Sequence, residues 1–234
     1  MTSDEAKQKL IDAGLILEML GQGDMARGHI SVRMPGDPGR FYMKPHTFGF
    51  DEMTMDNIVT CNLEGEKVEG WAPRHSEVYI HSEIFRARPD VTSVMHAHST
   101  WPLAFSATGR PLKVYTPGGA AFCDGLLVFT DTNDLIRKKE QGAEVARTLG
   151  PHSAVLLKNH GLAIATGSLE ETVVTAYVLE EACRVQLLIE AAGSALPEFA
   201  REDIGVLKKK VTSPEQYVIN FEYLRRKVRR ASGK

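Results

Sequence analysis

The spacing of hydrophobic and polar residues alternates along the chain between a helical period and a strand-like one. Residues 2–20 place apolar side chains at helical intervals after three candidate cap residues, Thr2, Ser3 and Asp4. The same spacing predicts long helices over 76–88, 140–150 and 168–193 and a short helix over 99–109. Short apolar runs predict strands at 40–45, 91–99, 111–117, 126–130, 153–161 and 162–166. Residues 21–34 predict a glycine-rich turn that leads into a strand, and residues 57–70 predict a strand, a turn and a second strand.

Turn and cap residues separate these elements. The segment PGDPG, residues 35–39, predicts a tight hairpin. Gly150 ends one helix, and Ser168 with Glu171 three residues later predicts a capping box at the start of the longest helix. The order of the elements predicts an α/β fold, with a mainly antiparallel central sheet between helices, in a single domain over residues 1–234. It does not predict a doubly wound nucleotide-binding fold.

Composition and charge narrow the classes of protein that fit. The 234 residues are 43% hydrophobic and 25% charged, enough to bury a sizeable core. The net charge of −2 gives no excess of positive charge for nucleic acid or an anionic membrane, and we interpret the basic tail at 223–234 as a solvated helix end. Neither a signal-peptide core nor the roughly 20 apolar residues of a membrane span is found.

Three cysteines, Cys61, Cys123 and Cys183, are far apart and lack the CxxC spacing. This pattern favours buried free thiols in a reducing compartment over disulfides. We therefore expect a cytoplasmic protein without a nucleic-acid or membrane partner.

Two histidines, His96 and His98, stand at the end of the apolar run at 91–99. Residues i and i+2 of a strand share a face, so both imidazoles can aim at one point. A third histidine, His160, ends another apolar run just before Gly161, whose missing side chain allows a sharp turn. Three imidazoles at strand ends suit a metal site that leaves positions open for water or substrate. Three hydrogen-bonded core histidines are the alternative.

Glu77 lies near the start of the helix predicted over 76–88. A carboxylate at that position is stabilised by the helix dipole, and it can serve as a fourth metal ligand, as an acid or base, or only as a cap. His81 follows four residues later on the same helix face. It is either structural or a support for a metal ligand.

Residues 75–109 and 156–186, which contain HSEVYIHSEIF, VMHAHST and KNHGLAIATGS, resemble the class II aldolase/adducin family. The resemblance extends over residues 5–195 and implies the αβα sandwich of class II aldolases. It also implies one divalent metal ion, Zn, Mn, Co or Fe, held by His96, His98 and His160. Glu77 matches the family's catalytic acid/base. Adducin-like members without enzyme activity lack this set of four residues, so its presence favours an enzyme.

The chain departs from the sugar-phosphate aldolases of the family at three positions. Where those aldolases read G-N-V-S, with an asparagine that helps to hold phosphate, this chain reads GHIS with His29. Their T-P-S/T-G loop is replaced by KPHTFGF with His46, and His75 replaces the first serine of S-S-E while Ser76 keeps the second. This variant is similar to the branch that contains pyridine-dicarboxylate decarboxylase.

Three imidazoles would occupy the space that a phosphate needs. We therefore expect a carboxylate or a planar hydroxy-aromatic acid, bound by His29, His46, His75 and Ser76. The alternative is that the three histidines pack on one another without touching substrate. If they carry protons, binding is expected to fall as the pH rises through about 6–7.

The resemblance implies a metal-dependent carbon–carbon lyase, an aldolase or decarboxylase. Its expected substrate is a small, non-phosphorylated hydroxy acid or carbonyl compound, which reacts through a metal-stabilised enolate while Glu77 moves the proton. An epimerase, a dehydratase, an iron-dependent oxygenase and a non-catalytic adducin-like module are the alternatives. Family members place the site at a subunit boundary, which implies a homo-oligomer, most simply a tetramer. Tyr115, in the stretch 111–129, would then cover a neighbour's site; the alternative is that this stretch is an internal loop.

Overall fold

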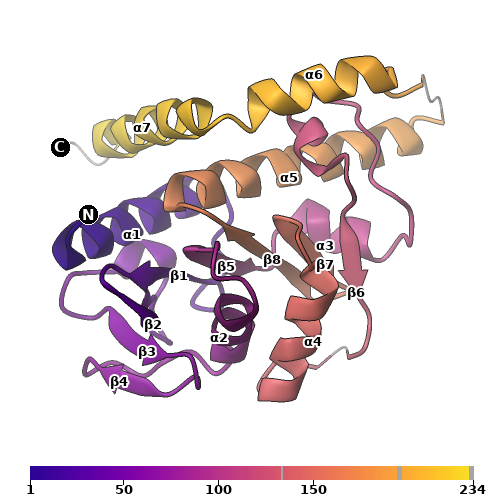
Figure 1. The fold of residues 1–234 in the computed structure, drawn as a ribbon. Coiled ribbons are helices and arrows are strands. Elements are labelled where there is room, and N and C mark those ends of the chain that lie inside the picture. The colour runs from indigo at the N-terminus through magenta and orange to yellow at the C-terminus, as the bar shows by residue number, and fades with distance from the viewer. Residues whose placement is uncertain (133, 194–196, 232–234) are drawn as a thin grey trace.

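The computed structural model describes residues 1–132, 134–193 and 197–231, and is built on one eight-stranded sheet (Figure 1). The strand order is β4-β3-β2-β1-β5-β8-β7-β6, antiparallel at every pair except β6 with β7. The strands are β1 (His29–Met34), β2 (Asp37–Met43), β3 (Val59–Asn62), β4 (Lys67–Glu69), β5 (Ser93–Ala97), β6 (Leu127–Phe129), β7 (Ala154–Leu157) and β8 (Gly161–Thr166).

Helices cover both faces of this sheet. They are α1 (Ser3–Met19), α2 (Val78–Ala87), α3 (Thr100–Ser106), α4 (Lys139–Leu149), α5 (Leu169–Ala191), α6 (Arg201–Val211) and α7 (Pro214–Ala231), with short 3₁₀ turns η1 (Phe50–Glu52) and η2 (Gly118–Phe122). Helices α1 and α5 lie on one face, and α2 and α4 lie on the other (Figure 1). The predicted αβα sandwich with a mainly antiparallel sheet is confirmed.

The side chains of β5 show how the two cores are separated. Met95 and Ala97 belong to the core under α1 and α5, whereas Val94 belongs to the core under α2 and α4. This alternation follows from the period of two residues along a strand. It sends His96 to the same side as Val94, as the sequence predicts.

The strand predicted over 111–117 is wrong. The backbone N–H of Lys113 donates to Gln186 Oε1, and that of Val114 donates to Glu198 Oε2, both at 2.8 Å. Side-chain acceptors from α5 and the segment after it thus take the place of a neighbouring strand. Pro111 and Pro117 at the two ends of the run lack the N–H that a strand ladder needs.

Two turn predictions are refined. The hairpin that was expected over 35–39 is shorter, because β2 already begins at Asp37. At the start of α5, Ser168 Oγ accepts from the N–H of Glu171, but the Glu171 carboxylate accepts from Gly167 N–H instead of closing the predicted capping box on Ser168. The N-cap of α1 is Thr2, with a full capping box to Glu5.

The basic tail is part of α7, which packs on α1 and α5 through buried Phe221. Residues 232–234 of that tail lie outside the described part of the chain. Among the helices in the described ranges, none is long and apolar enough to cross a membrane. Cys61 and Cys183 are buried as predicted, but Cys123, the residue after η2, is exposed.

We predict that Gly142→Ala destabilises the protein, because a Cβ on this residue of α4 would lie 2.4 Å from the Tyr79 carbonyl oxygen of α2. Overpacking of this kind costs about 1–3 kcal/mol. A contact of 2.4 Å with a backbone oxygen cannot be relieved by a side-chain movement, so we expect a cost in the upper part of this range. Such a cost exceeds the roughly 1 kcal/mol by which alanine is favoured over glycine inside a helix. Urea unfolding measures the change. Gly205→Ala in α6 is the control, because nothing lies within 4 Å of its added Cβ. Equal stability of the two variants would contradict the close contact of α2 and α4.

Candidate functional site

A cavity of about 760 Å³ lies where the end of β5 and the turn between β7 and β8 meet the start of α2. Six of the residues singled out from the sequence line it, and these are His46, His75, Ser76, Glu77, His98 and His160. The lining therefore combines segments that are up to about half the chain apart in sequence.

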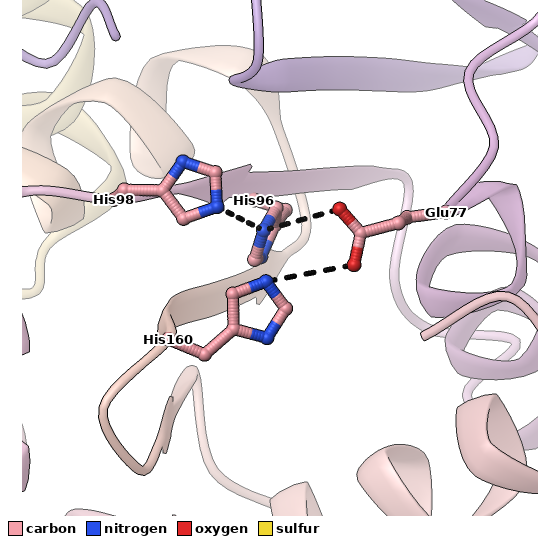
Figure 2. A group of neighbouring side chains, drawn as sticks. All are labelled: Glu77, His96, His98 and His160. Carbon is pink, nitrogen blue, oxygen red and sulfur yellow. Dashed lines mark hydrogen bonds and ion pairs between the residues drawn. The ribbon is translucent and has the colours of Figure 1, made fainter. Parts of the chain in front are cut away.

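Three histidines converge beside the carboxylate of Glu77 (Figure 2). The Nε2 atoms of His96 and His98 lie 3.1 Å apart, and His160 Nε2 lies 3.5 Å from Glu77 Oε1. One potential ligand atom from each of the four residues falls within 4.8 Å of all the others. The structure thus brings together all four residues that were predicted to form the metal site and its acid/base.

Hydrogen bonds behind the rings orient their lone pairs toward one point. His96 Nδ1 donates to the Leu162 carbonyl oxygen at 2.9 Å, and His98 Nδ1 donates to Asp24 Oδ2 at 2.7 Å. In neutral rings both Nε2 atoms then carry lone pairs, and these face each other. Burial favours neutral rings, because it lowers the pKa of His96 well below its usual value and that of His160 to about 4.

The unsatisfied nitrogens fit a divalent cation. Two facing lone pairs repel each other unless an electrophile lies between them. Neither ring nitrogen of His160 has a hydrogen-bond partner within the described ranges. Three neutral imidazoles with free lone pairs are a donor set that suits Zn, Mn, Co or Fe and leaves further positions open.

His160 lies in the turn before β8, three residues after the end of β7, and not at a strand end as predicted. Asn159, with φ of +58°, makes the turn. Gly161 is needed for another reason, because a Cβ there would lie 2.4 Å from the Ala97 carbonyl oxygen and 3.0 Å from His98 Cδ2. The missing side chain lets β8 approach β5 closely and so brings His160 to the other histidines.

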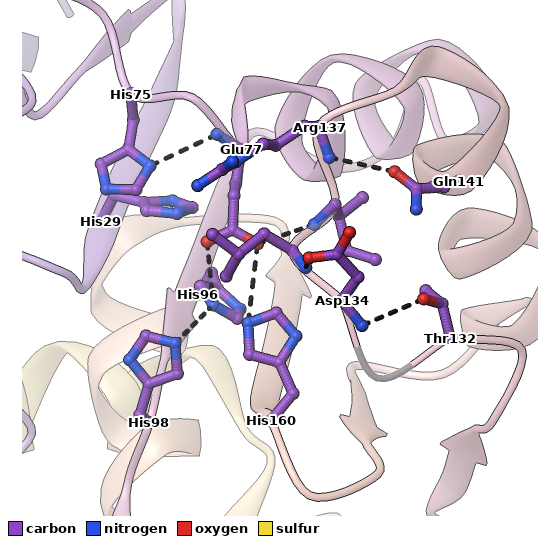
Figure 3. Close-up of polar contacts among 12 residues, drawn as sticks. His29, His75, Glu77, His96, His98, Thr132, Asp134, Arg137, Gln141 and His160 are labelled. Carbon is purple, nitrogen blue, oxygen red and sulfur yellow. Dashed lines mark hydrogen bonds and ion pairs between the residues drawn. The ribbon is translucent and has the colours of Figure 1, made fainter.

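Glu77 is the N-cap residue of α2, but its side chain forms no capping hydrogen bond. Its Oε1 accepts from the backbone N–H of Ile136 at 2.9 Å, and its Oε2 lies 3.9 Å from His96 Nε2 (Figure 3). Burial raises the pKa of the carboxyl, while the Ile136 hydrogen bond and the nearby Arg137 charge act in the opposite direction. A buried carboxyl with a raised pKa beside such a cluster is suited to proton transfer.

His29 and His81 form a buried hydrogen-bonded chain behind the pocket. His81 Nε2 lies 2.6 Å from His29 Nδ1, and His81 Nδ1 lies 2.6 Å from Ser31 Oγ. Ser31 Oγ donates in turn to the Val94 carbonyl oxygen at 3.4 Å. Because Ser31 uses its proton for Val94, Ser31 Oγ accepts from His81 Nδ1, and His81 Nε2 accepts from His29 Nδ1. The Nε2 atom of a neutral His29 then carries a lone pair, and this atom has no hydrogen-bond partner among the residues described. His81 therefore supports His29 and not one of the three converging histidines.

The three histidines expected to contact substrate do not all reach the pocket. Exposed His46 and buried His75 line it, with ring centroids 4.9 Å apart. His29 is fully buried against His75, with ring centroids 3.9 Å apart, and does not line the cavity. The N–H of Glu77 donates to His75 Nδ1 at 3.4 Å, which leaves the proton of the neutral ring on Nε2. Tyr115 is also absent from the lining of this cavity.

Burial overturns the protonation expected for two of these histidines, His29 and His75. It lowers the pKa of His75 to about 3 and that of His29 well below its usual value. Both rings are neutral at a pH of about 6–7, so they cannot cause a fall in binding across that range. They can bind an oxygen atom of a substrate only through hydrogen bonds.

Three residues of the site have no local signal in the sequence. Asp24 orients His98 from 74 positions away, and the N–H of Ile136 binds Glu77 from 59 positions away. Arg137 lines the pocket beside Glu77 (Figure 3). Each contact joins distant segments, so no spacing along the chain reveals it.

Comparisons with known proteins agree with this fold. The family described as "Class II Aldolase and Adducin N-terminal domain" matches residues 8–187. The structure of L-fuculose 1-phosphate aldolase from Glaciozyma antarctica PI12 superposes with a TM-score of 0.86 at 26% identity, and the match covers 99% of this chain and 91% of that one.

Two curated decarboxylases are also similar to this chain. Decarboxylase NovR of Streptomyces niveus is 35% identical over 172 residues, which are 73% of this chain and 64% of NovR, so the chain spans less than two thirds of that relative. The 3,4-dihydroxyphthalate decarboxylase of Terrabacter sp. (strain DBF63) is 27% identical over 214 residues, which are 86% of this chain and 88% of the relative.

The fold and the cluster define a class of α/β proteins with a candidate metal centre of three histidines and a glutamate, which lies at the ends of the central strands β5 and β8. The family match covers most of the chain. The chain belongs to the class II aldolase and adducin family.

We predict that the metal-free protein loses stability as the pH falls below about 6.5. Burial lowers the folded-state pKa of His81 to about 3 from 6.5, so between these values the unfolded chain binds a proton that the folded chain does not. Each such histidine makes the free energy of unfolding fall by about 1.4 kcal/mol for each pH unit of acidification. His81→Gln removes one of these histidines, so the slope of the free energy of unfolding against pH should become smaller by about 1.4 kcal/mol per pH unit. Urea unfolding at several pH values measures it, and an unchanged slope would contradict the buried neutral state.

Proposed function

We propose that this protein is a metal-dependent carbon–carbon lyase, a decarboxylase or aldolase, for a small hydroxy acid or carbonyl compound without a phosphate group. The observation that carries this proposal is the convergence of three imidazoles beside the buried carboxyl of Glu77, at one end of a pocket; one of them, His160, has no hydrogen-bond partner among the residues described. Cleavage of a carbon–carbon bond needs a site that withdraws electrons and a group that exchanges a proton with carbon. The cluster offers both.

His96, His98 and His160 would hold the divalent ion, which is Zn, Mn, Co or Fe in this proposal. When bound, the ion supplies Lewis-acid polarisation of substrate oxygens. Glu77 moves the proton. Because the Ile136 N–H occupies Oε1 of that carboxyl, we assign Oε2 to the proton exchange.

The pocket supports an acid or carbonyl substrate more than a sugar phosphate. His75 presents a neutral N–H on Nε2 beside Ser76, and His46 lies next to them at the opening. A phosphate with nearly two charges requires many short donors such as backbone N–H groups. The bulky rings leave less room for it. We assign His29 an indirect role, through its contact with His75. The two decarboxylase relatives support an acid substrate.

We also propose a cytoplasmic homotetramer. Tyr115 lies away from the pocket of its own chain, which supports a role at the pocket of a neighbouring copy. Three free cysteines, one of them exposed, support a reducing compartment.

We predict about one divalent ion per chain in the purified protein. The double variant His96→Ala with His98→Ala should lose it, because two of the three proposed ligands are gone. Elemental analysis measures the metal, and circular dichroism checks that the variant is folded. His46→Ala is the matched control, since this histidine lines the same pocket outside the cluster and its loss should leave the metal in place. Stoichiometric metal in the double variant would exclude the assignment.

We predict that the wild-type protein, reloaded with Mn, Zn, Co or Fe, cleaves a member of a panel of hydroxy acids and aldols, while fuculose phosphate and ribulose phosphate react poorly.

Glu77→Gln should keep the metal and lose about 10²–10⁴-fold in turnover, because the amide keeps the size but cannot transfer a proton. Product analysis measures both. A near-native rate in Glu77→Gln would rule out its acid/base role, and efficient turnover of a sugar phosphate would refute the proposed substrate class.

A further inference from the structure

Two arginines line the pocket, and they differ in their partners. Arg27 is neutralised by Asp24, whose Oδ1 lies 2.5 Å from Arg27 Nη2. Asp24 also binds His98, so Arg27 is part of the support of that ring. The Arg137 side chain is exposed and has neither a hydrogen bond nor an ion pair with any of the residues described. The lining therefore contains one arginine whose charge and donors are free for a ligand.

The backbone around Arg137 is fixed, although its side chain is free. The N–H of Arg137 donates to Gln141 Oε1 at 3.1 Å, and the N–H of Lys138 donates to the same atom at 3.0 Å. The preceding N–H, that of Ile136, binds Glu77 (Figure 3). The segment is thus held at both sides, by the start of α4 and by the carboxylate of the site. The backbone that carries this guanidinium is therefore anchored next to Glu77.

The remaining donors of the pocket are weak partners for an anion. Burial keeps His75 neutral, and His29 does not reach the cavity. A guanidinium carries a full charge and two parallel N–H groups that match the oxygens of a carboxylate. Its charge already acts on Glu77, where it opposes the rise in pKa that burial causes. A substrate carboxylate that binds Arg137 would therefore lie next to the proposed proton donor.

We propose that Arg137 is a specificity-determining residue that binds a carboxylate of the substrate while hydroxyl or carbonyl oxygens of the same molecule face the three histidines. This inference rests on the proposed function and narrows its substrate to a hydroxylated carboxylic acid. The carboxylate lies at the end of the molecule that points away from His96, His98 and His160. A compound with the same hydroxyl groups and no carboxylate is then a poorer ligand.

The test compares two probes on the zinc-loaded full chain by calorimetry. 3,4-Dihydroxybenzoate carries a pair of hydroxyl groups and a carboxylate, and catechol carries the hydroxyl pair alone. We expect the wild type to bind the first about ten- to a hundredfold more tightly, as for a charge-assisted hydrogen bond. Arg137→Gln should bring the ratio of the two affinities to about one, through weaker binding of 3,4-dihydroxybenzoate, and leave the affinity for catechol unchanged. Arg137→Lys should restore it only in part, because an ammonium lacks the paired donors.

Lys138→Gln is the matched control, since it removes one positive charge from the next residue, which does not line the cavity. The ratio of its affinities for 3,4-dihydroxybenzoate and catechol should equal that of the wild type. If Lys138→Gln and Arg137→Gln reduce this ratio equally, only the overall charge matters, and the role of Arg137 is refuted. An unchanged ratio in Arg137→Gln would refute it as well. If Arg137→Gln abolishes the ratio but the wild type cleaves no substrate, the carboxylate site stands and the lyase proposal fails. If neither probe binds, the role of Arg137 is refuted, while the lyase proposal is still decided by the product analysis.

Discussion

The approach of His96 Nε2 to His98 Nε2, at 3.1 Å, is the interaction on which the rest of the site depends. The antiparallel pairing of β5 with β8 places the Leu162 carbonyl behind His96, and Asp24 reaches His98 from the segment before β1. With both Nδ1 protons committed, two lone pairs face one point. Such an arrangement is unfavourable by itself and becomes favourable around a cation. Binding of an ion to this folded state would also stabilise it, because the unfolded chain does not hold the nitrogens together.

The polar groups behind the pocket are tolerated because they bind one another. Lys44 is fully buried, and its Nζ donates to the carbonyl oxygens of Ala26, Pro45 and Phe48. Burial still lowers its pKa to about 8. This ammonium joins the segment that carries Arg27 to the loop that carries His46. An unpaired buried group would cost several kcal/mol, so these hydrogen bonds keep both walls of the pocket in one arrangement.

The charges of the pocket are distributed unevenly, so its two ends favour different groups of a ligand. The histidine end is neutral and offers lone pairs, whereas Arg137 at the wall offers a charge and donors. Glu77 lies between them with a raised pKa. A ligand with oxygens of different charge at its two ends would bind in one orientation, with its reacting carbon near the carboxyl. If Arg137 binds a carboxylate as proposed, specificity depends on its free guanidinium as well as on His46 and His75, which line the same pocket.

The order of the elements in the sequence predicted the sandwich, and the strand period determined the direction in which His96 points, because these patterns extend over only a few residues. The set of four residues at the centre came from the spacing of the histidines together with the resemblance to the family. The prediction from the sequence failed at 111–117, where acceptors from Gln186 and Glu198 replace a strand neighbour. It also could not show that His75 is neutral or that Asp24 and Arg137 reach the site. Burial and pairing between distant segments arise only when the chain is folded. The tertiary structure alone therefore decided which lone pairs and charges are free.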